Sequence, residues 1–388
     1  MIKVIVASTI EAADIDFAIK EITSRIKTNE PLLRNTVGLL FCNLEFIQSG
    51  LVRELCARMS FDIVGCTSQI FAVQNAGEEF MLTLMVLTSD DVEFYAGVSE
   101  SLSQGKEAVL ESFYRDLLAR GKNPSLDPAL MLAFPPHLSG IPGNKLVDVL
   151  NDVSGGVPVF GSVAIDITTS MRSPMTIFNG SPYPDRLTMV LLRGNVQPRF
   201  FSHSLPGEPH LNQKFTITKA QGNKIFSIEN KPALEYMEEL GLVNQAMVDV
   251  FYAFPIVVDY HDGTEPRIFT ISKIDVDGAL VCEQEIPLGG TANIGTISGE
   301  LVMASTRAVI KRIRETTDRS GLILVSCFSR VLTLHDSLEE VNLVIRQMRD
   351  TPMPFVFFSS AGEICPISGT QGELQNSFHQ FTIIACVL

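Results

Sequence analysis

The sequence predicts a mixed α/β protein in which repeated strand–helix–strand–turn–strand units form mixed sheets covered by helices, arranged in two halves. Short runs such as residues 321–325 are apolar at nearly every position, which is typical of strands buried on both faces. Amphipathic helical segments alternate with these runs. The same order of elements also recurs three times along the chain, which indicates an internal structural repeat.

Each copy of the proposed repeat begins with an apolar strand and a helical segment. A second apolar strand then breaks into small residues, and a third strand follows later. The copies comprise residues 37–41, 49–60, 61–68 and 80–87; residues 129–133, 144–152, 157–164 and 186–192; and residues 321–325, 337–349, 354–366 and 380–387. The copies agree in order and little in identity, so chance agreement among α/β segments is the alternative.

Other segments fill the spaces around these units. The apolar residues of segment 2–7 predict a first strand. Apolar residues three and four positions apart predict a helix over residues 11–27. A second helix is predicted at 103–120. Residues 197–211 are rich in proline, glycine and histidine and predict a connector. We therefore expect one domain at 1–197 with two units, and another at 198–388 with an insertion and the third unit.

The predicted insertion begins with a hairpin signal, because apolar alternation flanks Gln221-Gly222-Asn223. A helix follows from Pro232 to Leu240, with proline in its first turn and glycine beyond its end. The remaining predictions are strands at 253–259 and 267–271, glycine-rich loops at 287–290 and 293–300, and a helix at 305–316.

Composition limits the class of protein. The chain has 388 residues, enough for two domains or one large core, and its net charge of -14 argues against nucleic-acid binding. Its seven cysteines are scattered and show no zinc-ligand spacing, so we expect a reducing compartment and no metal site. The start lacks a signal peptide, and no apolar run approaches the roughly 18 residues of a membrane span. The expected location is the cytoplasm, without membrane insertion.

The candidate binding residues lie where apolar strands break into small residues. In the last unit, Ser360 and Gly362 precede the carboxylate of Glu363, and backbone near such residues can approach a ligand closely. The matching turn of the first unit is Cys66-Thr67-Ser68, and that of the second ends at Asp166. A buried turn without function is the alternative interpretation.

Two charged residues suggest what such a site would bind. Arg330 follows Ser326-Cys327-Phe328-Ser329 and could bind a carboxylate through two hydrogen bonds, while Glu363 could bind an ammonium group. Ser360 or backbone amides would lie between them. The pair would suit an amino acid. The structural alternative is a salt bridge between Arg330 and Glu363.

Catalysis and cofactor binding are weaker interpretations. Cys66 or Ser68 could act as a nucleophile, or Glu363 and His379 could act as acid and base. The sequence shows no assembled base, orienting group and oxyanion site, so no residue is predicted to be catalytic. His379 could instead be a satisfied structural residue, a hydrogen-bond partner for a ligand, or an axial haem ligand.

Several of these motifs together resemble FIST-domain proteins. The segment Val64-Gly65-Cys66-Thr67-Ser68 is similar to the family's G-C-[ST]-S turn, and Phe160–Asp166 is similar to its second glycine turn. Further similar segments are 218–225, 232–241, 326–330, 362–366 and 378–382. The resemblance extends from about Val37 to the C-terminus. The chain departs from the pattern at Gln69-Ile70, at Gln380 in place of Asn, and at Phe215 in place of Trp.

The resemblance implies a sensory domain that binds small molecules such as amino acids and is coupled to signalling outputs. No kinase, cyclase or methyl-accepting module is visible in the sequence, so we expect the signal to pass to a separate protein partner. Some relatives are described as haem-binding nitric-oxide sensors, which is the cofactor alternative. No axial ligand maps onto a histidine here, so no cofactor is expected.

Overall fold

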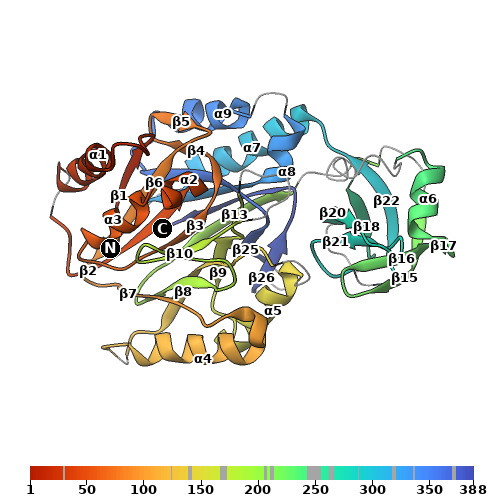
Figure 1. Ribbon diagram of the computed structural model, residues 1–388, viewed down its shortest axis with the longest axis horizontal. Helices are drawn as coiled ribbons and strands as arrows, with labels where there is room; N and C mark the ends of the chain where they lie inside the picture. The colour runs from red at the N-terminus through yellow and green to blue at the C-terminus, as the bar shows by residue number, and fades with distance from the viewer. Residues whose placement is uncertain are drawn as a thin grey trace.

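The computed structural model describes the chain with short gaps. The described residues are 1–28, 31–123, 125–138, 142–166, 173–204, 208–209, 214–242, 255–261, 266–286, 288–316, 320–334, 337–368 and 373–388. They form a mixed α/β core and a smaller inserted domain, which Figure 1 shows to the right of the core. The predicted fold class is confirmed.

Three six-stranded sheets form the core, and their strands follow one common order. The first sheet runs β1 (Lys3–Thr9), β6 (Leu82–Ser89), β2 (Asn35–Cys42), β3 (Ile63–Thr67), β10 (Thr176–Phe178) and β11 (Ser181–Tyr183). The second runs β7 (Glu93–Val98), β12 (Thr188–Arg193), β8 (Pro128–Phe134), β9 (Val159–Ser162), β25 (Glu363–Ser368) and β26 (Leu374–His379). The third runs β13 (Arg199–Ser204), β27 (Thr382–Val387), β23 (Leu322–Cys327), β24 (Phe355–Ser360), β4 (Gln69–Val73) and β5 (Ala76–Glu78).

Each sheet is centred on one predicted unit. The first strand of the unit (β2, β8 or β23) pairs in parallel with the second strand (β3, β9 or β24). It pairs antiparallel with the last strand (β6, β12 or β27). A parallel pair needs a crossover, and the helices between the two strands supply it. The three predicted units therefore share one topology.

The strand that follows each small-residue turn leaves its own sheet. After the turn of the first unit, β4 pairs with β24 of the third sheet. After the turn of the third unit, β25 pairs with β9 of the second sheet, and β10 of the second unit pairs with β3 of the first. This cyclic exchange ties the three sheets together and brings their turns to one place.

Helices cover the outward faces of the sheets, and the inward faces meet in a common core (Figure 1). On β2, Leu39 and Phe41 belong to the central cluster, while Leu40 and Cys42 pack toward the helices. The helices on the first sheet are α1 (Ile15–Thr28), α2 (Leu44–Gln48) and α3 (Leu51–Ala57). Those on the second are α4 (Lys106–Ala119) and α5 (Gly143–Ser154). Those on the third are α7 (Gly299–Arg314) and α9 (Glu339–Met348), together with the short helix α8 (Phe328–Thr333), which follows β23.

The inserted domain lies in the chain between β13 and α7 and has its own apolar core. Its sheet comprises β14 (Glu208–Pro209), β15 (Phe215–Gln221), β16 (Lys224–Ile228), β17 (Lys231–Pro232), β18 (Ile256–Asp259), β19 (Arg267–Phe269), β20 (Ile271–Ile274), β21 (Leu280–Cys282) and β22 (Thr291–Thr296). The helix α6 (Ala233–Glu239) packs on this sheet through Ala233, Tyr236 and Met237. The predicted hairpin and helix are confirmed; residues 253–254 of the next predicted strand lie outside the described residues.

Two predicted irregular segments contain strands instead. Residues 199–204, within the predicted connector, form β13, because Phe200 and Phe201 pack into two different apolar clusters on opposite faces of the strand. Residues 291–296 form β22, which overlaps the first part of the predicted loop 293–300. Gly295 is needed there for close packing, because an added Cβ would lie 2.7 Å from Val257 Cγ2. The proposed domain boundary at 197/198 stays a prediction.

Local boundaries also differ from the predictions in the functional region. The helix predicted at 49–60 is two short helices, α2 and α3, with Gly50 between them at φ +86°. Arg330 lies in α8 rather than at the end of a strand, and His379 ends β26 rather than beginning the last strand. Within the described ranges, no helix is both long and apolar enough to cross a membrane.

Candidate functional site

The three small-residue turns, one from each unit, meet at one place in the core. We call them the turn cluster, which comprises residues 65–69, 161–165 and 359–363. The backbone amide of Val163 donates to Gly362 O (2.9 Å), and that of Ala361 donates to Val163 O (3.2 Å). The amide of Ile165 donates to Thr67 O (3.1 Å). Turns that lie about 100 to 200 positions apart in the sequence are therefore directly hydrogen-bonded.

Two glycines allow this close approach. A Cβ added to Gly65 would lie 1.7 Å from Leu40 O, and one added to Gly161 would lie 1.7 Å from Ala133 O. No Cβ atom tolerates such a distance to backbone. With any other residue at these positions, β3 could not lie this close to β2, nor β9 to β8. At these two positions, the absence of a side chain serves backbone packing.

All residues of the turn cluster except Ala361 are buried. The predicted site residues Cys66, Thr67, Ser68, Ser360 and Glu363 are each at most 1% exposed. The structure thus brings together the predicted turn residues of the first and third units. It encloses them completely, so the cluster forms the floor beneath any binding site rather than its open surface.

Glu363 is the one acid inside the turn cluster. Ser360 Oγ donates to its Oε1 (2.5 Å), and among the described residues no atom has hydrogen-bond geometry to Oε2. Burial raises the pKa of Glu363 to about 8, although the Ser360 hydroxyl, the nearby Cys327 thiol and the charge of Arg330 all favour the ionised form. At neutral pH this residue is a protonated acid that can donate as well as accept.

Arg330 is fully buried and bonded within the protein. Its Nη2 forms an ion pair with Glu340 Oε1 (2.7 Å), and not with Glu363 as the structural alternative supposed. The other acceptors of its guanidinium group are Ser326 Oγ, Ser305 Oγ, Val302 O and Thr306 Oγ1. Because Arg330 belongs to the short helix α8, its side chain extends between α7 and α9, which supply all of these acceptors except Ser326 of β23.

The remaining predicted residues also have internal partners. His379 Nε2 lies 3.0 Å from Cys365 O, so it carries the proton and donates to that carbonyl. Burial lowers the pKa of His379, which keeps the ring neutral. Asp166 is 3% exposed and accepts from the Ser173 amide (2.5 Å). Gly362 packs against the ring of Phe378, which an added Cβ would meet at 2.3 Å.

Cys66 lacks the surroundings of a reactive thiol. Its Sγ lies 3.8 Å from Ser162 Oγ, and burial raises its pKa to about 12 despite that contact. A nucleophilic cysteine requires the thiolate, which an apolar and enclosed position disfavours. The geometry therefore offers no support for nucleophilic catalysis at this residue.

A small cleft opens beside the turn cluster, where the inserted domain meets the core. Its volume is about 30 Å³, which is room for about one water molecule. Val163 and Ala361 of the turn cluster form part of its lining, together with Phe378 of β26. His137, which follows β8, and Glu283 of the inserted domain complete the polar part of the lining.

The polar groups of the cleft form an ion pair. His137 Nε2 lies 3.3 Å from Glu283 Oε2, and both side chains are about one-fifth exposed. Burial alone would lower the pKa of His137, but the hydrogen bond and the charge of Glu283 outweigh burial and raise it. Burial likewise opposes ionisation of Glu283, and the bond to His137 outweighs it and lowers that pKa. The pair thus favours one positive and one negative group facing each other.

The inserted domain also grips the first turn of α5, through contacts that we call the clamp. The Gly143 amide donates to Glu283 O (3.0 Å), and the Glu285 amide donates to Asn144 Oδ1 (3.0 Å). Lys145 Nζ lies 2.8 Å from Glu285 Oε2. Residues 283–285 therefore occupy the amino end of a helix, where a carboxylate is favoured by the helix dipole.

The residues of the cleft were not found by sequence reasoning. His137 and Glu283 are 146 positions apart, and no local pattern links them. The available signals were the pair Pro135-Pro136 directly before a histidine, and two glutamates at 283 and 285 directly after a buried strand. Neither signal identifies its partner without the fold.

Metal and cofactor sites were also considered. Within the described part of the chain, no group of three or more His, Cys, Asp and Glu side chains could hold a metal ion. His379, the histidine considered for haem, has its Nε2 bound to a backbone carbonyl. The absence of a cofactor stays a prediction.

The fold and the cleft define an α/β protein of three exchanged units, with an inserted domain closing on the turns. Comparison with family models gives the family: residues 36–231 match the FIST N domain and residues 232–366 match the FIST C domain. The chain belongs to the FIST family, whose domains are sensory domains of signal-transduction proteins. The two models meet at the start of α6, within the inserted domain. No curated protein matches the chain.

Proposed function

We propose that this chain senses a small polar metabolite of the amino-acid class, which binds in the cleft between the turn cluster and the inserted domain. One observation carries this proposal. The turns of all three units converge beneath a single cleft, and a different domain covers that cleft through a His137–Glu283 ion pair. A site at a domain interface, with few convergent polar groups, is the common setting for small-ligand binding.

The chemistry of the cleft is complementary to a zwitterion. The His137 imidazolium and the Gly143 amide at the start of α5 would receive a carboxylate. Glu283 would receive an ammonium group, and the apolar lining at Phe378 would contact the side chain of the ligand. Protonated Glu363 lies behind this surface. These roles replace the pairing of Arg330 with Glu363 that the sequence suggested.

Binding would be coupled to movement of the inserted domain. A cleft with room for one water is too small for an amino acid, so the ligand must displace the carboxylate of Glu283 and open the clamp. A ligand shifts a conformational equilibrium only by its difference in affinity between the two states. Here the open state alone would hold the ligand, and the freed inserted domain would carry the signal to a separate partner.

A thermal-shift screen of the purified protein against the standard amino acids and small carboxylates tests the proposal. At a concentration a hundred times Kd, a ligand that binds only the folded state stabilises it by about 2.7 kcal/mol, so the melting temperature should rise by several degrees. Glu283→Gln and His137→Asn should each abolish most of that rise.

Asp275→Asn provides the matched control, because Asp275 pairs with Lys224 in the same domain, outside the residues that line the cleft. This variant should keep the full rise. A rise that is undiminished in both cleft variants would place the ligand elsewhere. If no compound in either class raises the melting temperature of the wild type, the proposed ligand class is wrong.

A further inference from the structure

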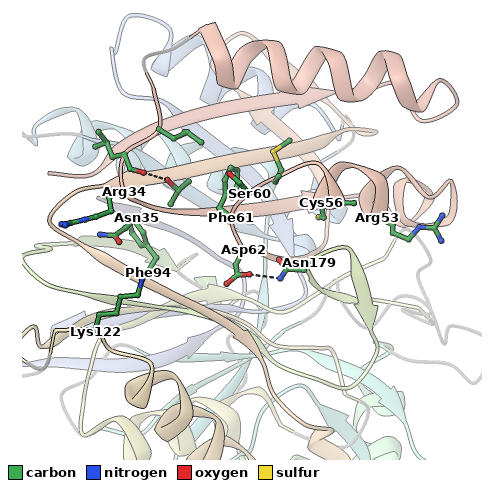
Figure 2. Close-up of a pocket in the computed structure, with 15 residues that line it drawn as sticks. Arg34, Asn35, Arg53, Cys56, Ser60, Phe61, Asp62, Phe94, Lys122 and Asn179 are labelled. Carbon is green, nitrogen blue, oxygen red and sulfur yellow. Dashed lines mark hydrogen bonds between the residues drawn. The ribbon is translucent and has the colours of Figure 1, made fainter.

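A second cavity, a groove of about 910 Å³, lies between the first and second sheets. Figure 2 shows its lining side chains. Arg34 and Asn35 come from the start of β2, and Asp62 comes from the loop before β3. Phe94 of β7 and Lys122, which follows α4, form the wall contributed by the second unit.

Positive charge collects in this groove, although the chain as a whole carries -14. Among the described residues, Arg34, Arg53 and Lys122 line it with a single acid, Asp62. A depression of about 560 Å³ adjoins it, and the two share lining residues. The shared residues are Leu32, Met59, Ser60 and Phe61, and the depression adds Lys20, Lys27 and Arg58 with one acid, Asp16. We call the groove and the depression together the basic groove.

Most of this charge is not neutralised by neighbours. Arg58 pairs with Asp16 (2.9 Å), and Arg53 pairs with Glu54 at 3.4 Å between exposed side chains, a weak contact. Among the described residues, the other four cations form no ion pair. They are Lys20, Lys27, Arg34 and Lys122. An anionic partner would therefore gain attraction here without first breaking internal ion pairs at those positions.

Asp62, the acid among the described lining residues of the larger cavity, is already hydrogen-bonded to the wall. Asn179 Nδ2 donates to Asp62 Oδ1 (2.8 Å), and Asn179 Oδ1 accepts from the Ile63 amide (2.8 Å). Asn179 and Gly180 both have positive φ, as in a tight hairpin turn between β10 and β11. An added Cβ at Gly180 would lie 2.9 Å from Arg53 Cα, so this turn packs directly on α3. The wall is therefore held in place by contacts within the protein, without a partner.

The other end of the groove is fixed in a similar way. The Arg34 amide donates to Asp90 Oδ1 (3.1 Å), and Arg34 Nη2 donates to Asp90 O (2.5 Å). In Figure 2, Arg34 and Lys122 lie at one end and Arg53 lies at the other, with Asp62 and Asn179 between them. The positive groups are thus spread along the groove rather than gathered around one point.

We propose that the basic groove binds an extended acidic segment of a partner protein. A compact anion would contact the charges at one end only, whereas an extended chain can contact both ends and continue into the adjoining depression. Phe61, Phe94 and Met59 supply apolar contacts between the charges. The inference rests on the part of the proposed function that passes the signal to a protein partner. It does not depend on the metabolite.

Fluorescence anisotropy with a labelled eight-residue peptide of six glutamates, one leucine and one phenylalanine tests this proposal without any metabolite. The wild-type protein should bind it at low salt, and the affinity should fall as salt increases. Arg34→Glu combined with Lys122→Glu should weaken binding at least about tenfold. Lys20→Glu combined with Lys27→Glu should weaken it roughly threefold, since these cations lie in the adjoining depression.

Arg346→Glu combined with Arg349→Glu is the control. It makes the same change in net charge at two exposed positions, one in α9 and one directly after its end, which line neither cavity, and should alter the affinity less than about twofold. Equal weakening in all three double variants would reduce the effect to net charge and overturn the proposal. Absence of peptide binding at low salt would also overturn it. Displacement of the peptide by millimolar inorganic phosphate or ATP, at constant ionic strength, would assign the groove to a small anion instead.

Discussion

The two ends of the parallel strands β2 and β3 differ sharply in what they leave open. At their carboxyl ends, Gly65 and its neighbours enter the turn cluster, where every predicted site residue of the first unit is sealed. At their amino ends, Asn35 and Asp62 line the basic groove of about 910 Å³. The same pair of strands therefore ends once in solid packing and once in an open cavity.

The difference lies in the size and charge of the terminal residues. Glycine and serine at the carboxyl ends let three chain segments approach until their backbones are hydrogen-bonded, which fills the space. Arg34 and Asp62 at the amino ends have charged groups that must keep contact with water, so the segments stay apart. Small residues at strand ends thus indicate where backbones meet, and they do not by themselves indicate a pocket.

The strongest test of this contrast is Gly65→Ala. The new Cβ would lie 1.7 Å from Leu40 O, so the backbone must move, and we expect a loss of unfolding free energy of at least about 3 kcal/mol. Gly38→Ala on β2 is the control, because the atoms nearest to its Cβ would belong to the side chains of Ile63 (2.9 Å), Leu84 (3.0 Å) and Phe61 (3.2 Å) rather than to backbone. That variant should lose about 1 to 2 kcal/mol. Urea denaturation measures both, and equal losses would contradict the close backbone contact.

A second test asks whether Arg330 belongs to the sealed region or to a ligand site. Arg330→Met would leave the carboxylate of Glu340 buried without its partner, so we expect a loss of about 3 to 5 kcal/mol in unfolding free energy. Adding Glu340→Leu should recover much of that loss, since the unpaired charge is then removed. Chemical denaturation of the two variants gives the comparison.

The opposite result would restore the carboxylate-binding role predicted for Arg330. In that case the Arg330→Met variant would keep the stability of the wild type and would lose the metabolite-dependent rise in melting temperature. Replacing an arginine that forms a structural ion pair lowers the unfolding free energy, whereas replacing an arginine whose only partner is a ligand does not.

Much of the fold could be predicted because its signals are local. Strands such as 321–325 are apolar on both faces, and the three units repeat in order, so the repeat could be predicted, whereas the pairing of its strands came from the structure. Residues 199–204 were missed because prolines flank the strand at a short distance and outweighed its two phenylalanines. Residues 291–296 were missed because Gly295 suggests a loop, although its role is to admit Val257.

The site was only partly predictable, because its essential relations are long-range. The three turns could be singled out because each ends an apolar strand of the repeat, and the structure brings all three together. Whether the convergence leaves a cavity depends on side-chain volume in three dimensions, which no spacing reports. The partner of Arg330 depended on its being in a helix, and the partner of His137 lies 146 positions away in an inserted domain.

The smallest effect over a single step of the measurement, one pH unit, concerns Glu363. Its pKa rises from an ordinary 4.5 to about 8 on folding, so between these values the folded protein holds a proton that the unfolded chain has lost. Stability from this proton is complete below pH 4.5 and disappears as the pH approaches 8. The unfolding free energy should fall by at most about 1.4 kcal/mol per pH unit in that window.

Glu363→Gln should remove this slope, because an amide does not titrate. His137 also contributes a fall with rising pH, but it is present in both proteins, so the difference between their denaturation curves isolates Glu363. If the two proteins show the same slope, Glu363 is ionised in the folded state. An ionised carboxylate with one oxygen lacking a partner requires water beside it, so the turn cluster would then be open, and the contrast between the two strand ends would fail.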